Sequence, residues 1–122
     1  EKQAEVNRKN AYRTLTWIMD ANFSGADLYV TYSFEKNKRP GEPKKFRAYV
    51  KQFLKQLRKL YRRARLRLKY IWVGERGERG AEHIHMVQSG GIDVRELKAA
   101  WPHGWINAIP MEDRGKVTGE TI

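Results

Sequence analysis

Two short apolar segments, joined by a turn rich in glycine and charge, form the stretch Trp72-Val-Gly-Glu-Arg-Gly-Glu-Arg-Gly-Ala-Glu-His-Ile-His-Met-Val87. This pattern predicts a β-hairpin. If the turn is centred on Arg79, Glu75 lies opposite His83, and directly opposed residues of antiparallel strands point to the same face. His85 shares that face because side chains alternate along a strand. The hairpin is therefore expected to bring Glu75, His83 and His85 together.

Two imidazoles and one carboxylate suit a divalent metal ion, with Mn²⁺ or Mg²⁺ expected here, and they leave coordination positions open for water or substrate. A His-x-His pair by itself is more often two surface or structural histidines. The matching register of Glu75 and the apolar flanks favour the metal site. Those flanks are Ile71, Val73 and Val87, which we expect to be exposed. The remaining histidine, His103, lies between Pro102 and Gly104 and is expected to be structural or solvated.

Length and composition predict one domain. The chain has 122 residues, of which 40% are hydrophobic, and it has no cysteine, which excludes disulfides and thiolate metal sites. We find no apolar run long enough for a membrane span and no signal-peptide pattern at the N-terminus. A cytoplasmic protein with no membrane partner is the expectation.

Positive charge is concentrated in one part of the chain. The formal net charge is +11, no acidic residue lies between Pro43 and Gly74, and almost half of the Lys and Arg residues lie between Lys44 and Lys69. Such a segment favours a polyanionic partner, with nucleic acid ahead of anionic membrane. A merely solvated cationic face is the alternative for any single residue. Candidate DNA contacts are Lys51, Lys55, Arg58, Arg62, Arg76 and Arg79.

The hydrophobic periodicity predicts four strands and three helices. The strands are expected at residues 28–34, 66–74, 81–89 and 105–109, and the helices at 4–22, 44–64 and 94–100. The predicted fold class is therefore α+β, an antiparallel sheet with the ferredoxin-like β-α-β-β-α-β order plus an N-terminal helix. Within the single domain, residues 1–27 form the N-terminal helix and turn, 28–110 the core and 111–122 a tail.

Three motifs resemble those of the HUH endonucleases, and more narrowly the rolling-circle replication initiators of phages, plasmids and small circular DNA viruses. His83-Ile-His85-Met-Val resembles the second motif of that family. The strand Leu28-Tyr-Val-Thr-Tyr-Ser-Phe34 resembles the first motif, and Val73-Gly-Glu-Arg-Gly resembles the segment that supplies a third metal ligand. The likeness covers about residues 8–110.

The resemblance implies a metal-dependent endonuclease that nicks and joins single-stranded DNA at an origin or hairpin through a phosphotyrosine. It implies metal-ligand roles for Glu75, His83 and His85. In those initiators the tyrosine follows the histidines, whereas all six tyrosines here precede His83. Conjugative relaxases carry theirs near the N-terminus, which makes Tyr12 a substitute nucleophile. We expect instead that the tyrosine belongs to sequence past Ile122, so that this chain binds DNA without nicking it.

Two alternatives remain open at this point. A non-catalytic module of the same topology, similar to an RRM, would bind single-stranded nucleic acid through aromatic residues on the exposed sheet face. There the sequence offers Tyr29 as the main aromatic, beside the histidines. A basic structural adaptor would need neither the histidines nor the aromatics.

Overall fold

The computed structural model of this chain describes residues 9, 13, 14, 22–77 and 81–112. The described elements are β1 (Leu28–Phe34), the 3-10 helix η1 (Lys36–Lys38), α2 (Pro43–Arg63), β2 (Tyr70–Arg76), β3 (Glu82–Gln88), α3 (Val94–Ala100) and β4 (Gly104–Pro110). The predicted order β-α-β-β-α-β and the α+β class are confirmed. The predicted N-terminal helix lies mostly outside the described residues, and its described positions are helical.

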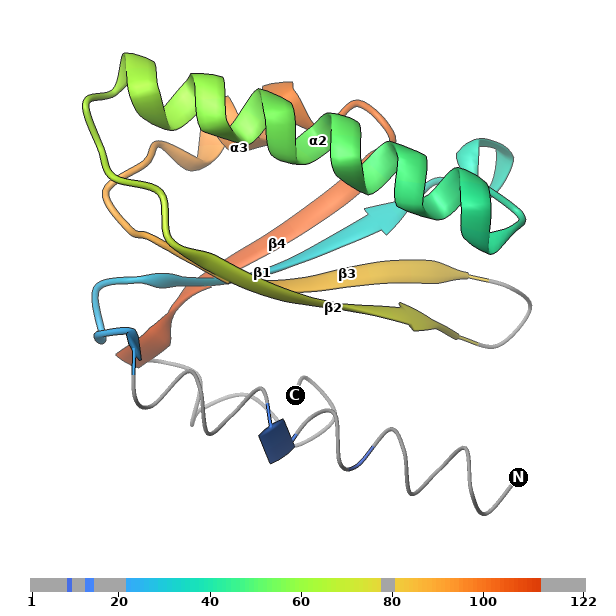
Figure 1. The fold of residues 1–122 in the computed structure, drawn as a ribbon, viewed down its shortest axis with the longest axis horizontal. Helices are drawn as coiled ribbons and strands as arrows, with labels where there is room; N and C mark the ends of the chain where they lie inside the picture. Colours follow the sequence, from blue (N-terminus) through green and yellow to red (C-terminus); the bar gives the residue numbers. More distant parts are fainter. Residues whose placement is uncertain (1–8, 10–12, 15–21, 78–80, 113–122) are drawn as a thin grey trace.

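The four strands form one antiparallel sheet in the order β2-β3-β1-β4. Both α2 and α3 lie on one side of this sheet (Figure 1). Within the described part of the chain, β2 and β4 are the edge strands and β3 and β1 are central. This arrangement separates a helix-covered face from the face that carries the histidines.

Strand β2 begins at Tyr70, four residues later than the sequence predicted. Arg65 adopts a left-handed backbone conformation with φ of 59°, and the Leu66 amide donates a hydrogen bond to the Tyr61 carbonyl. These two features close the C-terminus of α2, so the following residues turn the chain toward the sheet. The first strand pair is Tyr70 with Gln88.

Helix α2 is amphipathic, and its apolar side supplies much of the core. Pro43 is its first residue, where a missing amide hydrogen costs no helix bond. The buried side chains recur at helical spacing and pack against the sheet and Trp101; they are Val50, Phe53, Leu57, Leu60 and Tyr61. Its cations lie on the opposite, exposed side.

A chain of buried hydrogen bonds joins α2 to the two central strands. The Tyr32 hydroxyl donates to Gln88 Oε1 at 2.5 Å, and Gln88 Nε2 donates to the Tyr61 hydroxyl at 2.9 Å. The Tyr61 hydroxyl in turn donates to the Ser89 carbonyl at 2.6 Å. Gln88 is fully buried, so this network satisfies polar groups that water does not reach.

We predict that Gln88→Leu lowers the free energy of unfolding by about 1–3 kcal/mol, because the buried Tyr32 hydroxyl then lacks an acceptor. Urea denaturation monitored by circular dichroism measures the change. Tyr32→Phe removes the stranded hydroxyl, so the double variant should lose less stability than the sum of the two single variants. Wild-type stability in Gln88→Leu would contradict the role of the network.

Candidate active site on the histidine-bearing face of the sheet

The predicted hairpin register is confirmed. Glu75 of β2 pairs with His83 of β3, and Val73 pairs with His85. On the other side of β3, strand β1 places Ser33 opposite His83 and Thr31 opposite His85. Since paired residues in antiparallel strands point to the same face, three adjacent strands contribute polar side chains to one surface.

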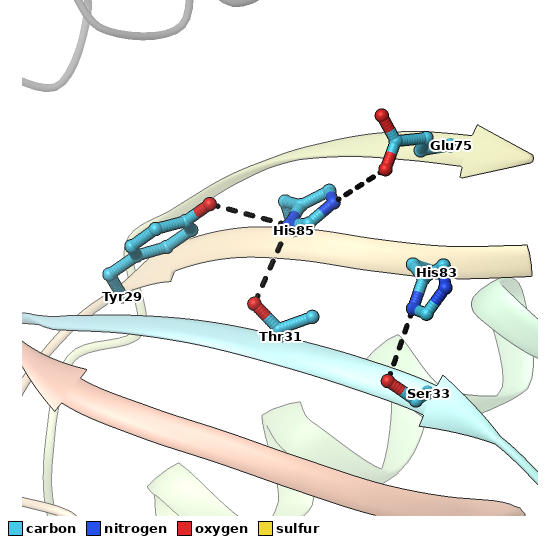
Figure 2. Close-up of polar contacts among 6 residues, drawn as sticks. All are labelled: Tyr29, Thr31, Ser33, Glu75, His83 and His85. Carbon is cyan, nitrogen blue, oxygen red and sulfur yellow. Dashed lines mark hydrogen bonds and ion pairs between the residues drawn. The ribbon is translucent and has the colours of Figure 1, made fainter. Parts of the chain in front are cut away.

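His85 is the centre of this polar group. Its Nε2 atom lies 3.3 Å from Glu75 Oε1, and its Nδ1 atom lies 3.3 Å from the Tyr29 hydroxyl and 3.4 Å from Thr31 Oγ1 (Figure 2). A neutral imidazole satisfies these contacts by accepting at Nδ1 and donating from Nε2 to the carboxylate. The residue is 8% exposed, and its ring is held from both sides.

His83 is held by a different partner. Its Nδ1 atom lies 3.1 Å from Ser33 Oγ (Figure 2), and its ring centroid is 6.3 Å from that of His85. The close contact of the Glu75 carboxylate is with His85, its diagonal neighbour, although His83 is the directly opposed residue. In the part of the chain that the structure describes, no three His, Asp or Glu side chains are grouped closely enough to hold a metal ion.

The donor atoms nevertheless fit a divalent ion in identity and partly in spacing. Two ligand atoms that each lie about 2.1 Å from one ion are roughly 3–3.5 Å apart, and Glu75 and His85 meet that condition. His83 lies on the same face, two residues from His85 along β3, with Nδ1 engaged by Ser33. Completing a three-ligand set requires His83 to exchange its contact with Ser33 for the ion.

Electrostatics favour a neutral His83. Burial lowers its pKa first of all, and the neighbouring His85 and the Arg39 guanidinium lower it further, while Glu75 opposes them. A neutral imidazole keeps a lone pair available for a metal. Arg39 follows η1 and was not among the predicted site residues, and its influence on His83 depends on how that loop folds back.

Tyr29 acts as a support for His85. Burial, with a smaller contribution from the Glu75 charge, raises the pKa of its hydroxyl to about 12. The phenol therefore stays protonated at neutral pH and donates to the imidazole. A buried, protonated hydroxyl is a poor nucleophile, so Tyr29 orients His85.

The apolar flanks of the site are more enclosed than predicted. Val87 is 0% exposed and forms a small cluster with Tyr29 and Met111, against which Ile71 and Val73 pack while half-buried. The expectation that all three flanking residues are exposed was therefore wrong. Pairing of β3 on both sides places Val87 between Ile71 and Tyr29, where neighbouring side chains cover it.

Trp105 is the residue on this face that the sequence analysis missed. It pairs with Ser33, which pairs with His83, so one row crosses all four strands and ends on Glu75. Its side chain is 63% exposed. The alternation in Trp105-Ile-Asn-Ala-Ile109 showed that Trp105 and Asn107 share a face, but not that β4 would pair with β1.

The predicted DNA contacts separate into distinct places. Lys51, Lys55, Arg58 and Arg62 are exposed on α2, so the sheet lies between them and the histidines (Figure 1). Arg76 is exposed at the end of β2. Arg79 and the substitute nucleophile Tyr12 lie outside the described residues.

Comparison with protein families supplies the missing context. Residues 27–118 match the model of a family described as replication-associated protein, ORF2 type. The chain belongs to this family. No curated protein and no solved structure matches it. Among the described residues no helix is long and apolar enough to cross a membrane. The candidate site thus lies on a replication-associated protein, with β1, β2, β3 and β4 all inside the matched range.

Proposed function

We propose that this replication-associated chain is the nuclease domain of a rolling-circle initiator of the HUH type. In that role Glu75, His83 and His85 hold a divalent ion, Mn²⁺ or Mg²⁺, and the substrate is single-stranded DNA at an origin. The observation that carries the proposal is the contact of 3.3 Å between Glu75 and His85 beside His83, in a chain of a replication-associated family. A carboxylate and two imidazoles on one sheet face are the ligand set such chemistry needs.

The side chains around these ligands support the same chemistry. Tyr29 and Thr31 hold the His85 ring, and Ser33 holds His83 until a ligand competes for it. Arg39 adds positive charge beside His83, where the phosphate would lie. A bound divalent ion supplies Lewis-acid polarisation of a phosphoryl oxygen at this place.

The attacking tyrosine comes from outside the described residues in this proposal. Tyr29, Tyr32 and Tyr61 are buried, and Tyr49 and Tyr70 pack against the core on the helix side. The nucleophile is then either Tyr12 or a tyrosine of a longer protein that continues past Ile122.

A non-catalytic single-strand binding module is the second candidate function. The exposed Trp105 favours it, because aromatic rings on an open sheet face stack on bases. The close approach of only two of the three ligands, Glu75 and His85, also favours it. Metal binding and cleavage distinguish the two candidates, because a binding module needs neither.

Mn²⁺ should raise the melting temperature of the wild-type protein. At a free concentration 100 times the Kd, the expected stabilisation is about 2.7 kcal/mol. The double variant His83→Ala/His85→Ala should show no shift, as measured by differential scanning calorimetry. His103→Ala is the matched control, because His103 packs between Phe34, Tyr49 and Trp101, away from the ligands. An unshifted wild type would refute the metal site.

A longer version that continues past Ile122 should cleave a single-stranded origin oligonucleotide in Mn²⁺ and remain covalently attached to one product. Denaturing electrophoresis detects the adduct, and peptide mass analysis identifies the modified tyrosine. If that residue is downstream, Tyr12→Phe leaves cleavage unchanged; if Tyr12 is the nucleophile, the substitution abolishes the adduct. Absence of cleavage in every version would favour the binding module.

Trp105→Ala should weaken binding of a single-stranded oligonucleotide about 5-fold or more, because one stacked base contributes about 1–3 kcal/mol. Fluorescence anisotropy at fixed salt concentration measures the affinity. Trp105→Phe keeps a stacking ring and should retain most of it. Equal affinity in the alanine variant would mean that DNA does not cross this part of β4.

A further inference from the structure

A cavity of about 350 Å³ lies at the β2 edge of the sheet, whereas Trp105 lies on the opposite edge strand, β4. It is formed where the first turn of α2 passes over the end of the β2–β3 hairpin (Figure 1). Its walls come from both elements and comprise Pro43, Phe46, Arg47, Trp72, Gly74, Glu75, Arg76 and Glu82. Neither the sequence motifs nor the proposed nuclease chemistry makes use of it.

Glu82 is the unusual group in this cavity. Its side chain is 6% exposed, and its Oε1 atom is buried without a hydrogen-bond partner among the described residues. A buried acceptor left unpaired costs free energy, and more so when it belongs to a carboxylate. The described part of the fold offers no compensation at this position, so the group points to a ligand that brings N–H donors.

The other walls define the rest of that ligand. The rings of Phe46 and Trp72 meet edge to face, with centroids 6.4 Å apart, and provide an aromatic surface. A Cβ atom on Gly74 would lie 2.8 Å from Phe46, so glycine lets the ring lie against β2. Arg47 and Arg76 are exposed cations at the mouth. Aromatic walls, one acceptor and two guanidinium groups are the features that recognise a nucleotide.

We propose that this cavity binds a single guanine base of the DNA strand. Guanine has two neighbouring N–H donors, the ring imino group and the exocyclic amino group, which one carboxylate accepts together. Adenine and cytosine present one amino donor beside a ring acceptor, and thymine presents one N–H between two carbonyls. Those acceptors would face the Glu82 carboxylate. Guanine is therefore the preferred base, with Phe46 and Trp72 against its ring.

The position of the cavity links it to the candidate site and rests, to that extent, on the proposed function. Strand β2 is an edge strand, and Glu75 both lines the cavity and contacts His85. A DNA strand that crosses this edge has a base on the helix side and a phosphate on the histidine side. Guanine recognition would then set which phosphate reaches the histidines.

Metal-free binding tests the proposal independently of nicking. In EDTA, fluorescence anisotropy compares short thymidine oligonucleotides that carry one central guanine, adenine or cytosine with the all-thymine strand. We expect the guanine strand to bind about 5-fold or more tightly than the others. Glu82→Gln should abolish this preference and leave the affinity for the all-thymine strand within about 2-fold of the wild type. Glu96→Gln, the same change at an exposed site on α3, should keep the preference.

A second measurement guards against a folding defect in Glu82→Gln. Free dGMP should raise the melting temperature of the wild type more than dTMP does, and this difference should vanish in Glu82→Gln at unchanged circular dichroism. Equal affinity for all four strands, or a guanine preference that survives Glu82→Gln, would overturn the proposal. Loss of nicking with guanine preference intact would refute only the nuclease, and the reverse only the pocket.

Discussion

The pairing of β3 with β1 on one side and β2 on the other is the constraint on which the candidate site depends. Alternation along β3 puts His83 and His85 on one face, and the register of its neighbours brings Glu75 and Ser33 beside them. A slip of one residue would turn both histidines toward the helices. It would also expose Ile84 and Met86, which are fully buried. Burial of the core therefore enforces the geometry of the polar face.

Separation of the two faces divides the positive charge from the candidate site. The exposed cations of α2 dominate the composition, but the sheet stands between them and His85 (Figure 1). At that distance they attract a polyanion through the overall field and do not contact the phosphate at the site. Arg39, which acts on His83, is the cation positioned for local contact. Long-range attraction and local recognition thus belong to different residues.

The site has a rigid part and an adjustable part. His85 is held by Tyr29, Thr31 and Glu75, whereas His83 has its recorded side-chain contact with Ser33. A hydroxyl contact of about 1 kcal/mol is easily exchanged for a stronger ligand. Ligand binding at this face would therefore cost a rotation of one ring, with the backbone and the other ring already in place.

Local pattern in the sequence determined the order of elements, the strand faces and the hairpin register, because each depends on residues near one another in the chain. The Glu75–His83 pairing followed from one short turn and the period of two. Tertiary structure decided the rest. Pairing of β4 with β1 put Trp105 in the row of His83, and packing of α2 on the hairpin enclosed Glu82 beside Phe46. These contacts join residues distant in sequence, where no local periodicity specifies which element becomes the neighbour.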